Sequence, residues 1–340
     1  MSALTHPVRI AVCGAGAFGT NHLRILHELP QVALVAAVEP DPARSASVAA
    51  QYSIPVFSSL DAALSADLAL DAAVVAVPTV HHCQVAGQLL AAGIDCLVEK
   101  PLAPTLAQAD DLIAVAARHQ RILQPGHLER FNPAVLAMQQ DLRGPMFFEA
   151  HRLSIFTPRS LDVDVVLDLM IHDLDVVLRF AASPVRELRA VGLPILSGKV
   201  DIANVRVEFE SGCVANFTAS RVSTERIRKL RYFEPGRYVS IDYARRDALV
   251  IGVDRDFDLS SAMQVGAAED FRNGLPGLSF DQPAIAPGEP LRLELESFLH
   301  SVCTRHEPFV TAQHGREALA LALAIQQQMA SHAARVGITA

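Results

Sequence analysis

The sequence predicts an α/β protein in which a doubly wound parallel sheet is followed by an α+β domain with an open, mainly antiparallel sheet. Three observations predict this fold. Short apolar strands alternate with helical stretches up to residue 125. Beyond that point, long strands are joined by hairpin turns. A chain of 340 residues is also too long for one typical core, so we place one domain at residues 1–125 and a second at residues 126–340.

The composition excludes several classes of protein. Hydrophobic residues make up 51% of the chain and charged residues 19%, which is typical of a folded globular protein. The net charge of −8 gives no basic footprint for nucleic acid. No apolar run reaches the roughly 18 to 20 residues that span a bilayer, and the first run is a strand rather than a signal peptide. Five scattered cysteines without a Cys-x-x-Cys motif suit reduced thiols, so we expect a cytoplasmic protein without a metal site.

The first strand, Val8–Cys13, runs into a glycine-rich turn and then a helix at residues 20–29. The first glycine permits the tight turn, the second lets the backbone approach a pyrophosphate, and the third lets the helix pack close to the strand. This pattern is typical of a dinucleotide-binding Rossmann domain, although a purely structural glycine turn has the same form. The residues that we assign to the turn are Gly14, Gly16, Ala17, Phe18 and Gly19.

The second strand, Val32–Val38, ends at Glu39, twenty residues beyond Gly19. A carboxylate at this position can accept hydrogen bonds from the adenosine ribose and repels a 2′-phosphate, so it predicts NAD as the cofactor. Arg44 lies close enough to keep NADP as the less favoured alternative. A solvated acid that only opens the following turn is the structural alternative.

The alternation of strands and helices continues through the first domain. Further strands are expected at residues 71–77, 94–98 and 121–125, and helices at 42–52, 82–92 and 105–119. Ligands of such sheets bind at the carboxyl ends of the strands. Lys100 is the first catalytic candidate there, because a lysine near a nicotinamide can hydrogen-bond a substrate hydroxyl; a solvated loop lysine is the alternative. The strand-end residues that we assign to the cofactor are Pro78, Thr79, His82, Glu99 and Lys100.

The second domain reads as a sheet of hairpins. Strands are expected at residues 145–155, 200–210, 213–222, 228–234, 237–243 and 247–253, helices at 133–142, 291–304 and 311–336, and a long loop at 258–290. Hairpin turns at Ser211-Gly212 and Pro235-Gly236 favour an open antiparallel sheet with helices on one face. If its other face is apolar, a second subunit is the usual cover, so we expect a homodimer or homotetramer.

A helix expected at residues 162–181 is apolar almost all the way round and is therefore buried on most sides. Asp168 and His172 lie one helical turn apart on it, and Asp175 and Arg179 continue the same stripe. Burying a carboxylate and an imidazole is costly unless they have partners. The residues leave two interpretations open: a structural Asp–His pair inside a core, or a stripe that lines a cavity where a proton moves.

Four motifs occur in one order along the chain, and together they resemble the glucose–fructose oxidoreductase, inositol dehydrogenase and MocA (Gfo/Idh/MocA) family over essentially its whole length. They are the Gly14–Gly19 turn, Glu99-Lys100-Pro101, Arg130-Phe131-Asn132-Pro133 and Asp168-x-x-x-His172. The stretches GHLERFNPA (126–134) and DLMIHDLD (168–175) are most similar to the branch that oxidises the 3-hydroxyl of UDP-N-acetylglucosamine or related nucleotide sugars. Members that act on free sugars or inositol often carry Asn where this chain has Leu128.

The resemblance implies an NAD-dependent dehydrogenase whose catalytic residues are Lys100, Asp168 and His172. His172 would take the proton of a sugar hydroxyl, since an imidazole of ordinary pKa, about 6.5, suits a base at neutral pH. Lys100 would stabilise the developing alkoxide, and Asp168 would orient His172 or hold a neighbouring hydroxyl. The roles of Lys100 and His172 could be exchanged.

For a substrate diphosphate we nominate Arg130, Arg152 and Arg159, because the planar guanidinium makes bidentate contacts with phosphate. Ordinary salt-bridge arginines are the alternative for each. Two alternatives to the nucleotide-sugar dehydrogenase stay open. One is a dehydrogenase or reductase of a free sugar, inositol or another polyol. The other, outside the enzymes, is a catalytically silent dinucleotide-binding regulator.

Overall fold

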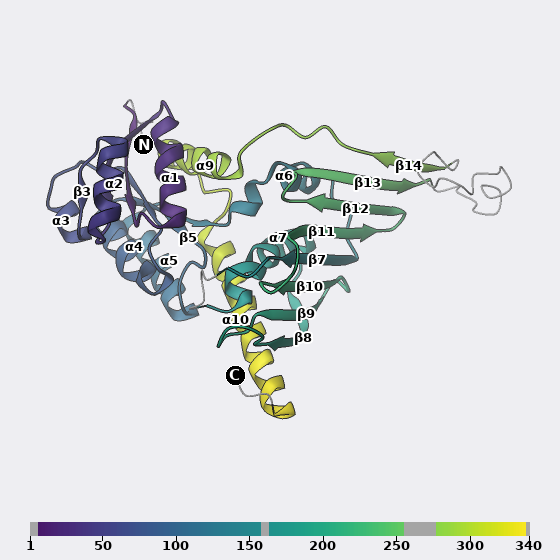
Figure 1. Ribbon diagram of the computed structural model, residues 1–340. Helices are drawn as coiled ribbons and strands as arrows, with labels where there is room; N and C mark the ends of the chain where they lie inside the picture. The colour runs from purple at the N-terminus through teal and green to yellow at the C-terminus, as the bar shows by residue number, and fades with distance from the viewer. Residues whose placement is uncertain (1–5, 158–162, 255–276, 338–340) are drawn as a thin grey trace. The chain divides into compact units, whose positions relative to one another are not determined.

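The computed structural model describes residues 6–157, 163–254 and 277–337. The chain forms two compact units, Met1–Phe131 with Glu289–Ala320, and Asn132–Gly288 with Leu321–Ala340 (Figure 1). It therefore passes from one unit to the other three times: after Phe131, after Gly288, and within the long helix α10 (Ala312–Val336).

The first unit contains a six-stranded parallel sheet in the order β3-β2-β1-β4-β5-β6. Its strands are β1 (Val8–Cys13), β2 (Val32–Val38), β3 (Val56–Phe57), β4 (Ala72–Val75), β5 (Asp95–Glu99) and β6 (Leu123–Gly126). All four residues of β4 are buried, as expected for a strand covered on both faces. The predicted doubly wound parallel sheet is confirmed; the two-residue edge strand β3 was not predicted.

Helices connect these strands. They are α1 (Ala17–Glu28), α2 (Pro42–Tyr52), α3 (Leu60–Leu64), η1 (Thr79–His81), α4 (His82–Ala91), α5 (Leu106–His119) and η2 (Leu128–Phe131). Two helix starts follow directly from their sequence. Asp41 accepts a hydrogen bond from the backbone N–H of Arg44 ahead of Pro42, and Thr105 caps α5 by accepting from Gln108. The five-residue α3 was not predicted.

Helix α9 (Pro290–Thr304) completes the core of the first unit. Leu291, Leu295 and Phe298 belong to the same buried hydrophobic cluster as Leu23 of α1 and Val74 of β4. The sequence-based division at residue 125 assigned this helix to the second domain because it follows the second-domain strands. Its apolar face instead packs in the first core, so a single cut in the chain does not describe residues 289–320.

The second unit contains an eight-stranded sheet in the order β14-β13-β12-β11-β7-β10-β9-β8. Its strands are β7 (Phe147–Leu153), β8 (Val185–Leu193), β9 (Ile202–Phe209), β10 (Val214–Ser220), β11 (Ile227–Glu234), β12 (Arg237–Asp242), β13 (Asp247–Val253) and β14 (Leu278–Asp281). The β7–β10 pair is parallel and the other pairs are antiparallel, so the predicted mainly antiparallel sheet is confirmed. Strands β8 and β14 were not predicted, and residues 255–276 of the expected long loop lie outside the described residues.

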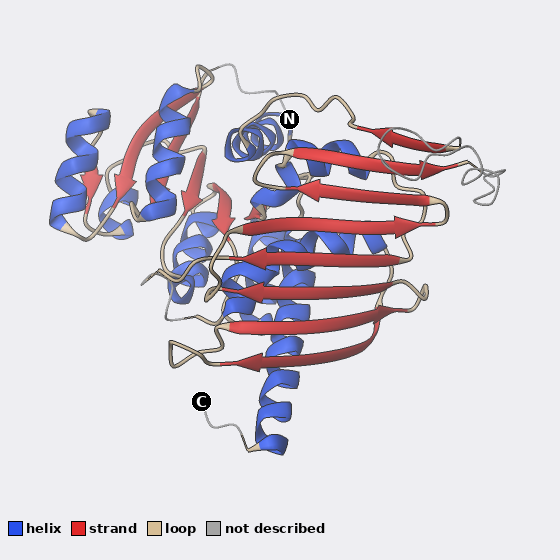
Figure 2. Ribbon diagram, turned by 45° about the vertical axis from the view of Figure 1, so that its right-hand side comes forward, coloured by secondary structure: helices blue, strands red, loops and turns tan. Residues whose placement is uncertain are grey.

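One face of this sheet carries the core. Along β9, Ala203, Val205 and Val207 are buried, whereas Asn204 and Arg206 on the other face are exposed. Figure 2 shows the helices behind the sheet and the opposite face turned towards the viewer. The helices of this unit are α6 (Pro133–Gln139), η3 (Val166–Met170), α7 (Ile171–Ala181) and the second half of α10.

The helix expected at residues 162–181 is not a uniform α-helix. Residues Val166–Met170 form a π-helical segment that continues into α7. Asp164 holds its beginning, because one carboxylate oxygen accepts from the N–H groups of Val166 and Leu167 at 3.0 and 3.1 Å. The other oxygen accepts from the side-chain amide of Gln326 at 2.6 Å. Single π-helical turns occur frequently at functional sites, and this one contains Asp168.

Candidate active site

The glycine turn leaves room for a pyrophosphate. Gly14 has φ +94°, and a Cβ there would meet the Ala76 carbonyl oxygen at 2.6 Å. A Cβ on Gly19 would lie 1.9 Å from the Gly14 carbonyl oxygen, so both positions require glycine. A Cβ on Gly16 would meet no atom within 4 Å, and Gly16 begins α1 without a side-chain cap. An open space beside an uncapped helix N-terminus fits a phosphate group. Ala17 and Phe18 form the first turn of α1.

Glu39 is buried, with 3% of its surface exposed, and is attached to the glycine turn. One carboxylate oxygen accepts from the Ala15 N–H at 2.8 Å, and the other accepts from the Asp41 N–H at 2.9 Å. The Arg44 guanidinium lies 3.3 Å from the second oxygen. Glu39 is therefore not a solvated acid. Its carboxylate joins the end of β2 to the turn and has lone pairs left for further donors.

His82, which the sequence assigns to the cofactor, is buried between two backbone carbonyl groups, and its contact with the cofactor stays a prediction. His82 is 1% exposed; its Nδ1 lies 2.9 Å from the Pro101 carbonyl oxygen and its Nε2 lies 3.0 Å from that of Val77. Burial lowers the pKa of His82, although the two carbonyls and Glu99 oppose this effect. The ring bridges two strand ends. Pro78 is exposed and Thr79, at the start of η1, is partly exposed.

Glu99 and Lys100 end strand β5. Glu99 accepts a hydrogen bond from His22 Nε2 at 2.7 Å, and His22 is fully buried in α1. Burial alone would raise the pKa of Glu99, but the hydrogen bond from His22 and the positive charges of His22, Lys100 and His82 hold it below its usual value. Lys100 itself is partly exposed. Sequence reasoning missed His22; its place on α1, three residues after Gly19, was the only available signal.

In the second unit, Asp168 lies in the π-helical segment and His172 follows in the first turn of α7; both are partly exposed. Asp173 and Asp175 on the same helix are 2% exposed. Within the polar stripe, Asp175 is buried, whereas Asp168, His172 and Arg179 are partly exposed, which suits residues that meet a substrate.

The three arginines nominated for a diphosphate differ in their surroundings. Arg152 is buried and makes two hydrogen bonds to Asp173, at 2.7 and 2.9 Å, while its guanidinium lies 5.0 Å from the centroid of the Tyr243 ring. These contacts favour a structural role for Arg152, and its role in substrate binding stays a prediction. Arg130 is 1% exposed and lies 4.9 Å from the centroid of the Phe309 ring. Arg159 lies outside the described residues.

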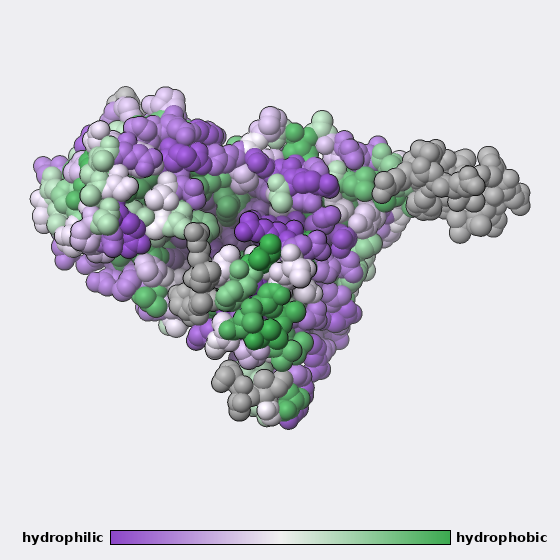
Figure 3. All heavy atoms as spheres, viewed as in Figure 1, coloured by the Kyte–Doolittle hydropathy of each residue, from purple (hydrophilic) through white to green (hydrophobic). Residues whose placement is uncertain are grey.

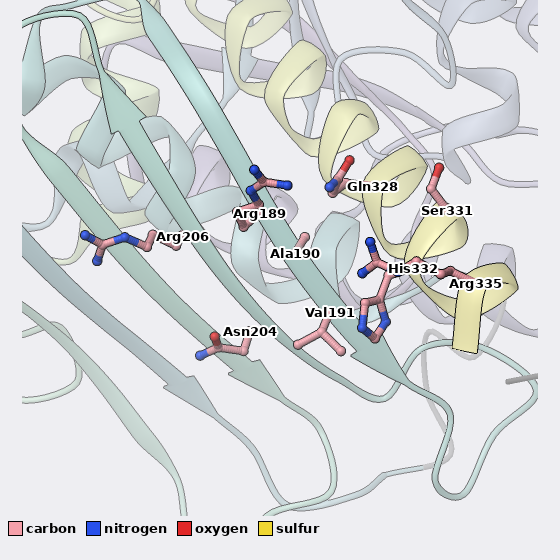
Figure 4. Close-up of a pocket in the computed structure, with 9 residues that line it drawn as sticks. All are labelled: Arg189, Ala190, Val191, Asn204, Arg206, Gln328, Ser331, His332 and Arg335. Atoms are coloured by element: carbon pink, nitrogen blue, oxygen red, sulfur yellow. The ribbon is translucent and has the colours of Figure 1, made fainter. Parts of the chain in front are cut away.

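A pocket of about 300 Å³ occurs elsewhere in the second unit, between β8, β9 and α10 (Figure 4). None of its lining residues is a candidate catalytic or cofactor residue. The lining residues are Arg189, Ala190, Val191, Asn204, Arg206, Gln328, Ser331, His332 and Arg335.

Comparison with known proteins decides the family. Residues 8–127 match the model described as "Oxidoreductase family, NAD-binding Rossmann fold", and residues 134–234 match the GFO/IDH/MocA C-terminal domain. The chain is 34% identical to the UDP-N-acetylglucosamine 3-dehydrogenase of Acidithiobacillus ferrooxidans, over 94% of this chain and 96% of that protein. The chain belongs to the Gfo/Idh/MocA family of oxidoreductases.

Among solved structures, the same relative is structurally similar to this Gfo/Idh/MocA protein. The A. ferrooxidans dehydrogenase matches with a TM-score of 0.84 and 33% identity, covering 96% of this chain and 98% of that one. An inositol 2-dehydrogenase of Leifsonia xyli subsp. xyli is 34% identical over 53% of this chain and 56% of its own length. An aldose-aldose oxidoreductase from Caulobacter crescentus, at 20% identity and a TM-score of 0.79, shows the same fold.

The A. ferrooxidans and L. xyli relatives are named dehydrogenases, and the Gfo/Idh/MocA protein described here is accordingly a nicotinamide-dependent dehydrogenase that acts on CH–OH groups. The alternative of a silent dinucleotide-binding regulator is thereby set aside. Within the described ranges, none of the helices is both long and apolar enough to span a membrane.

Proposed function

We propose that this protein is an NAD-dependent dehydrogenase that oxidises the 3-hydroxyl of UDP-N-acetylglucosamine or a closely related nucleotide sugar. The observation that carries the proposal is the 34% identity to a UDP-N-acetylglucosamine 3-dehydrogenase over 94% of the chain. The inositol dehydrogenase similarity spans only 53% of the chain. Leu128, in place of the Asn that is frequent in free-sugar members, further supports a nucleotide sugar.

The charges around the end of β2 support NAD rather than NADP. The carboxylates of Glu39 and Asp41 both lie within reach of the Arg44 guanidinium, at 3.3 and 3.7 Å. Two carboxylates and one guanidinium leave a net negative charge, which disfavours a 2′-phosphate. The nicotinamide of the bound cofactor supplies the hydride acceptor; the glycine turn and Glu39 would hold its adenosine diphosphate part.

Side chains of this protein would accept the proton that the reacting sugar hydroxyl loses. His172 would accept the proton of the reacting hydroxyl, and Asp168 would orient the imidazole or hold a neighbouring hydroxyl. Lys100 would stabilise the negative charge that develops on the sugar oxygen. The two roles of Lys100 and His172 remain exchangeable. For the diphosphate we favour Arg159 and Arg130 over Arg152.

The open face of the second-unit sheet supports a homo-oligomer. Five neighbouring strands each contribute one apolar residue to a single row, in which every residue pairs with the next across the strands. The row is Val214, Phe147, Phe233, Tyr238 and Ile251. The rings of Phe147 and Phe233 are 5.4 Å apart, and those of Phe233 and Tyr238 are 5.2 Å apart. Among the residues that the structure describes, no helix covers this face (Figure 2), and an apolar row on such a face is typical of a subunit interface. We therefore propose that a second copy packs on this face.

The cysteines support a reducing compartment. All five are free thiols: Cys13, Cys83, Cys96, Cys213 and Cys303. Burial raises the pKa of Cys13 to about 12, which keeps that thiol unreactive. A cytoplasmic location agrees with this set of reduced thiols.

The decisive experiment is turnover of NAD by the purified protein, followed at 340 nm, with UDP-N-acetylglucosamine, free N-acetylglucosamine and myo-inositol in parallel. The proposal expects NADH formation with the nucleotide sugar alone, and product analysis should give the 3-keto sugar. Turnover of the free sugar or of inositol at an equal rate would replace the nucleotide-sugar proposal with the polyol alternative.

A further inference from the structure

Two buried histidines hold the residues on either side of Lys100. Glu99, before it, accepts a hydrogen bond from His22 Nε2 at 2.7 Å. The carbonyl oxygen of Pro101, after it, lies 2.9 Å from His82 Nδ1. His22 belongs to α1 and His82 begins α4, and the two side chains are 0% and 1% exposed. The end of β5 is therefore held from two neighbouring helices.

The other ring nitrogen of each histidine has a different environment in the two residues. His22 Nδ1 is buried and has no hydrogen-bond partner among the residues that the structure describes, so the bond to Glu99 is the contact that this ring makes. His82 Nε2 lies 3.0 Å from the Val77 carbonyl oxygen, on the connection that leads to Pro78 and Thr79. His82 therefore joins the end of β4 to the end of β5.

Burying two imidazoles in a hydrophobic domain is costly unless they have hydrogen-bond partners. An aliphatic residue at either position would remove the contact to Glu99 or to Pro101. Each ring has one nitrogen within hydrogen-bond distance of the three-residue segment Glu99-Lys100-Pro101, and the other nitrogen of His82 lies near the Val77 carbonyl oxygen. A catalytic group displaced by about 1 Å can lose on the order of a hundredfold in rate, so firm support of this segment has a functional value.

We propose that His22 and His82 are positioning residues for Lys100, which act through Glu99 and Pro101. Together these four residues form a histidine clamp. It holds the side chain of Glu99 before Lys100 and the backbone of Pro101 after it, and so sets where the ammonium group of Lys100 lies. The inference rests on the catalytic role of Lys100 in the proposed function. It also gives His82 a role other than direct contact with the cofactor.

The test compares His22→Ala, His82→Ala and the corresponding Gln variants with the parent protein. The clamp predicts that each Ala variant loses about ten- to a hundredfold in kcat at saturating NAD and sugar. The dissociation constant of NAD, measured by direct titration, should stay within about threefold, because the glycine turn is untouched. Gln keeps one amide donor and should restore part of kcat. His81→Ala is the matched control: His81 is exposed, adjacent to His82 and outside the clamp, so its kcat should equal that of the parent.

Two results would overturn the clamp: a kcat within about twofold of the parent in both Gln and Ala variants, or a loss of NAD affinity as large as the loss of kcat. Crystal structures of the parent and of His82→Ala with bound NAD give a readout independent of turnover. The clamp predicts that the backbone of residues 99–101 shifts, and an unchanged backbone contradicts it. A parent protein that oxidises no sugar with NAD would refute the proposed function, while the structural comparison would still decide on the clamp.

Discussion

The guanidinium of Arg152 and the carboxylate of Asp173 form a bidentate pair with nitrogen–oxygen distances of 2.7 and 2.9 Å, and both residues are almost fully buried. The pair connects β7 to α7 inside the second unit. Because Asp173 already neutralises Arg152, a substrate diphosphate would have to displace a buried carboxylate to reach it.

Arg152→Ala should therefore act on stability. Removing one member of a buried ion pair leaves the other charge without compensation, so we expect the free energy of unfolding to fall by about 3–5 kcal/mol, measured by urea titration. Arg186→Ala is the control, since Arg186 pairs with Glu208 at the surface and should lose less than about 1 kcal/mol. If Arg152→Ala left the free energy of unfolding unchanged and weakened the binding of UDP-N-acetylglucosamine, Arg152 would be a substrate-binding residue.

His172→Ala tests the assignment of the base. Loss of a general base should lower kcat on the order of 10²-fold or more, whereas the affinity for NAD should be unchanged because His172 belongs to the second unit. Steady-state kinetics and NAD titration measure the two quantities separately. A kcat within a few-fold of the parent would move the base role to Lys100.

Cofactor preference follows from Glu39. The parent protein should bind NAD more tightly than NADP, and Glu39→Ala should narrow the difference because the 2′-phosphate loses a repelling carboxylate. The same change also removes an acceptor for the Ala15 N–H, so NAD itself should bind less tightly. Titration of both cofactors by calorimetry measures the effect. Equal dissociation constants for NAD and NADP in the parent would contradict the assignment.

Asp201 predicts a loss of stability in acid. Burial alone would raise its pKa, but hydrogen bonds from the Ser197 hydroxyl and from the N–H groups of Ile195, Leu196 and Ser197 hold it well below the usual value. A carboxylate with a depressed folded-state pKa stabilises the protein above its unfolded pKa of about 4, and this contribution disappears as the pH falls further.

Asp201→Asn should consequently lose about 3 kcal/mol at pH 7, since the charge also pairs with Arg221 at 2.8 Å. Its stability should then fall less steeply than that of the parent below pH 4. Urea unfolding at a series of pH values measures both effects, with the exposed Glu210→Gln as the control. If the free energy of unfolding of Asp201→Asn fell with decreasing pH as steeply as that of the parent, other carboxylates would be responsible for the loss of stability in acid.

Asp201 also stabilises the surface connection between β8 and β9. Its three backbone contacts fix this connection, on which Ile195 and Leu196 are exposed, as is Leu193 at the end of β8. Figure 3 shows hydrophobic residues gathered on the second unit near the place where β8, β9 and α10 lie in Figure 1.

The sequence predicted those parts of the fold whose signals are local. Strand β4 is a continuous apolar run, and the glycine turn needs residues without a Cβ at fixed spacing, so both were recognisable. Strand β8 was missed because Arg186, Glu187 and Arg189 give it the charge pattern of a loop, which is how exposed edge strands resist aggregation. The π-helical segment was missed because five apolar-rich residues have the same composition in either helix type.

The sequence predicted those features of the candidate site that depend on neighbouring residues in the chain. It did not predict contacts between residues that are far apart in the sequence. The sequence indicated Glu99 and Lys100 from their place at a strand end. It could not indicate that His22, 77 residues earlier, bonds to Glu99. Nor could it show that Arg152 meets Asp173, because other carboxylates, such as Glu149 and Asp168, are closer to Arg152 along the chain.

The position of α9 has a consequence for synthesis on the ribosome. The core beside α1 and β4 needs Leu291, Leu295 and Phe298, so the first unit lacks part of its buried surface until the chain has been translated past Phe298. Domains usually fold as they emerge, N-terminal first. Here the nascent N-terminal segment must wait for nearly the whole second unit to be made. A ribosome stalled at residue 131 should therefore expose a protease-sensitive chain, and one stalled beyond residue 330 should not.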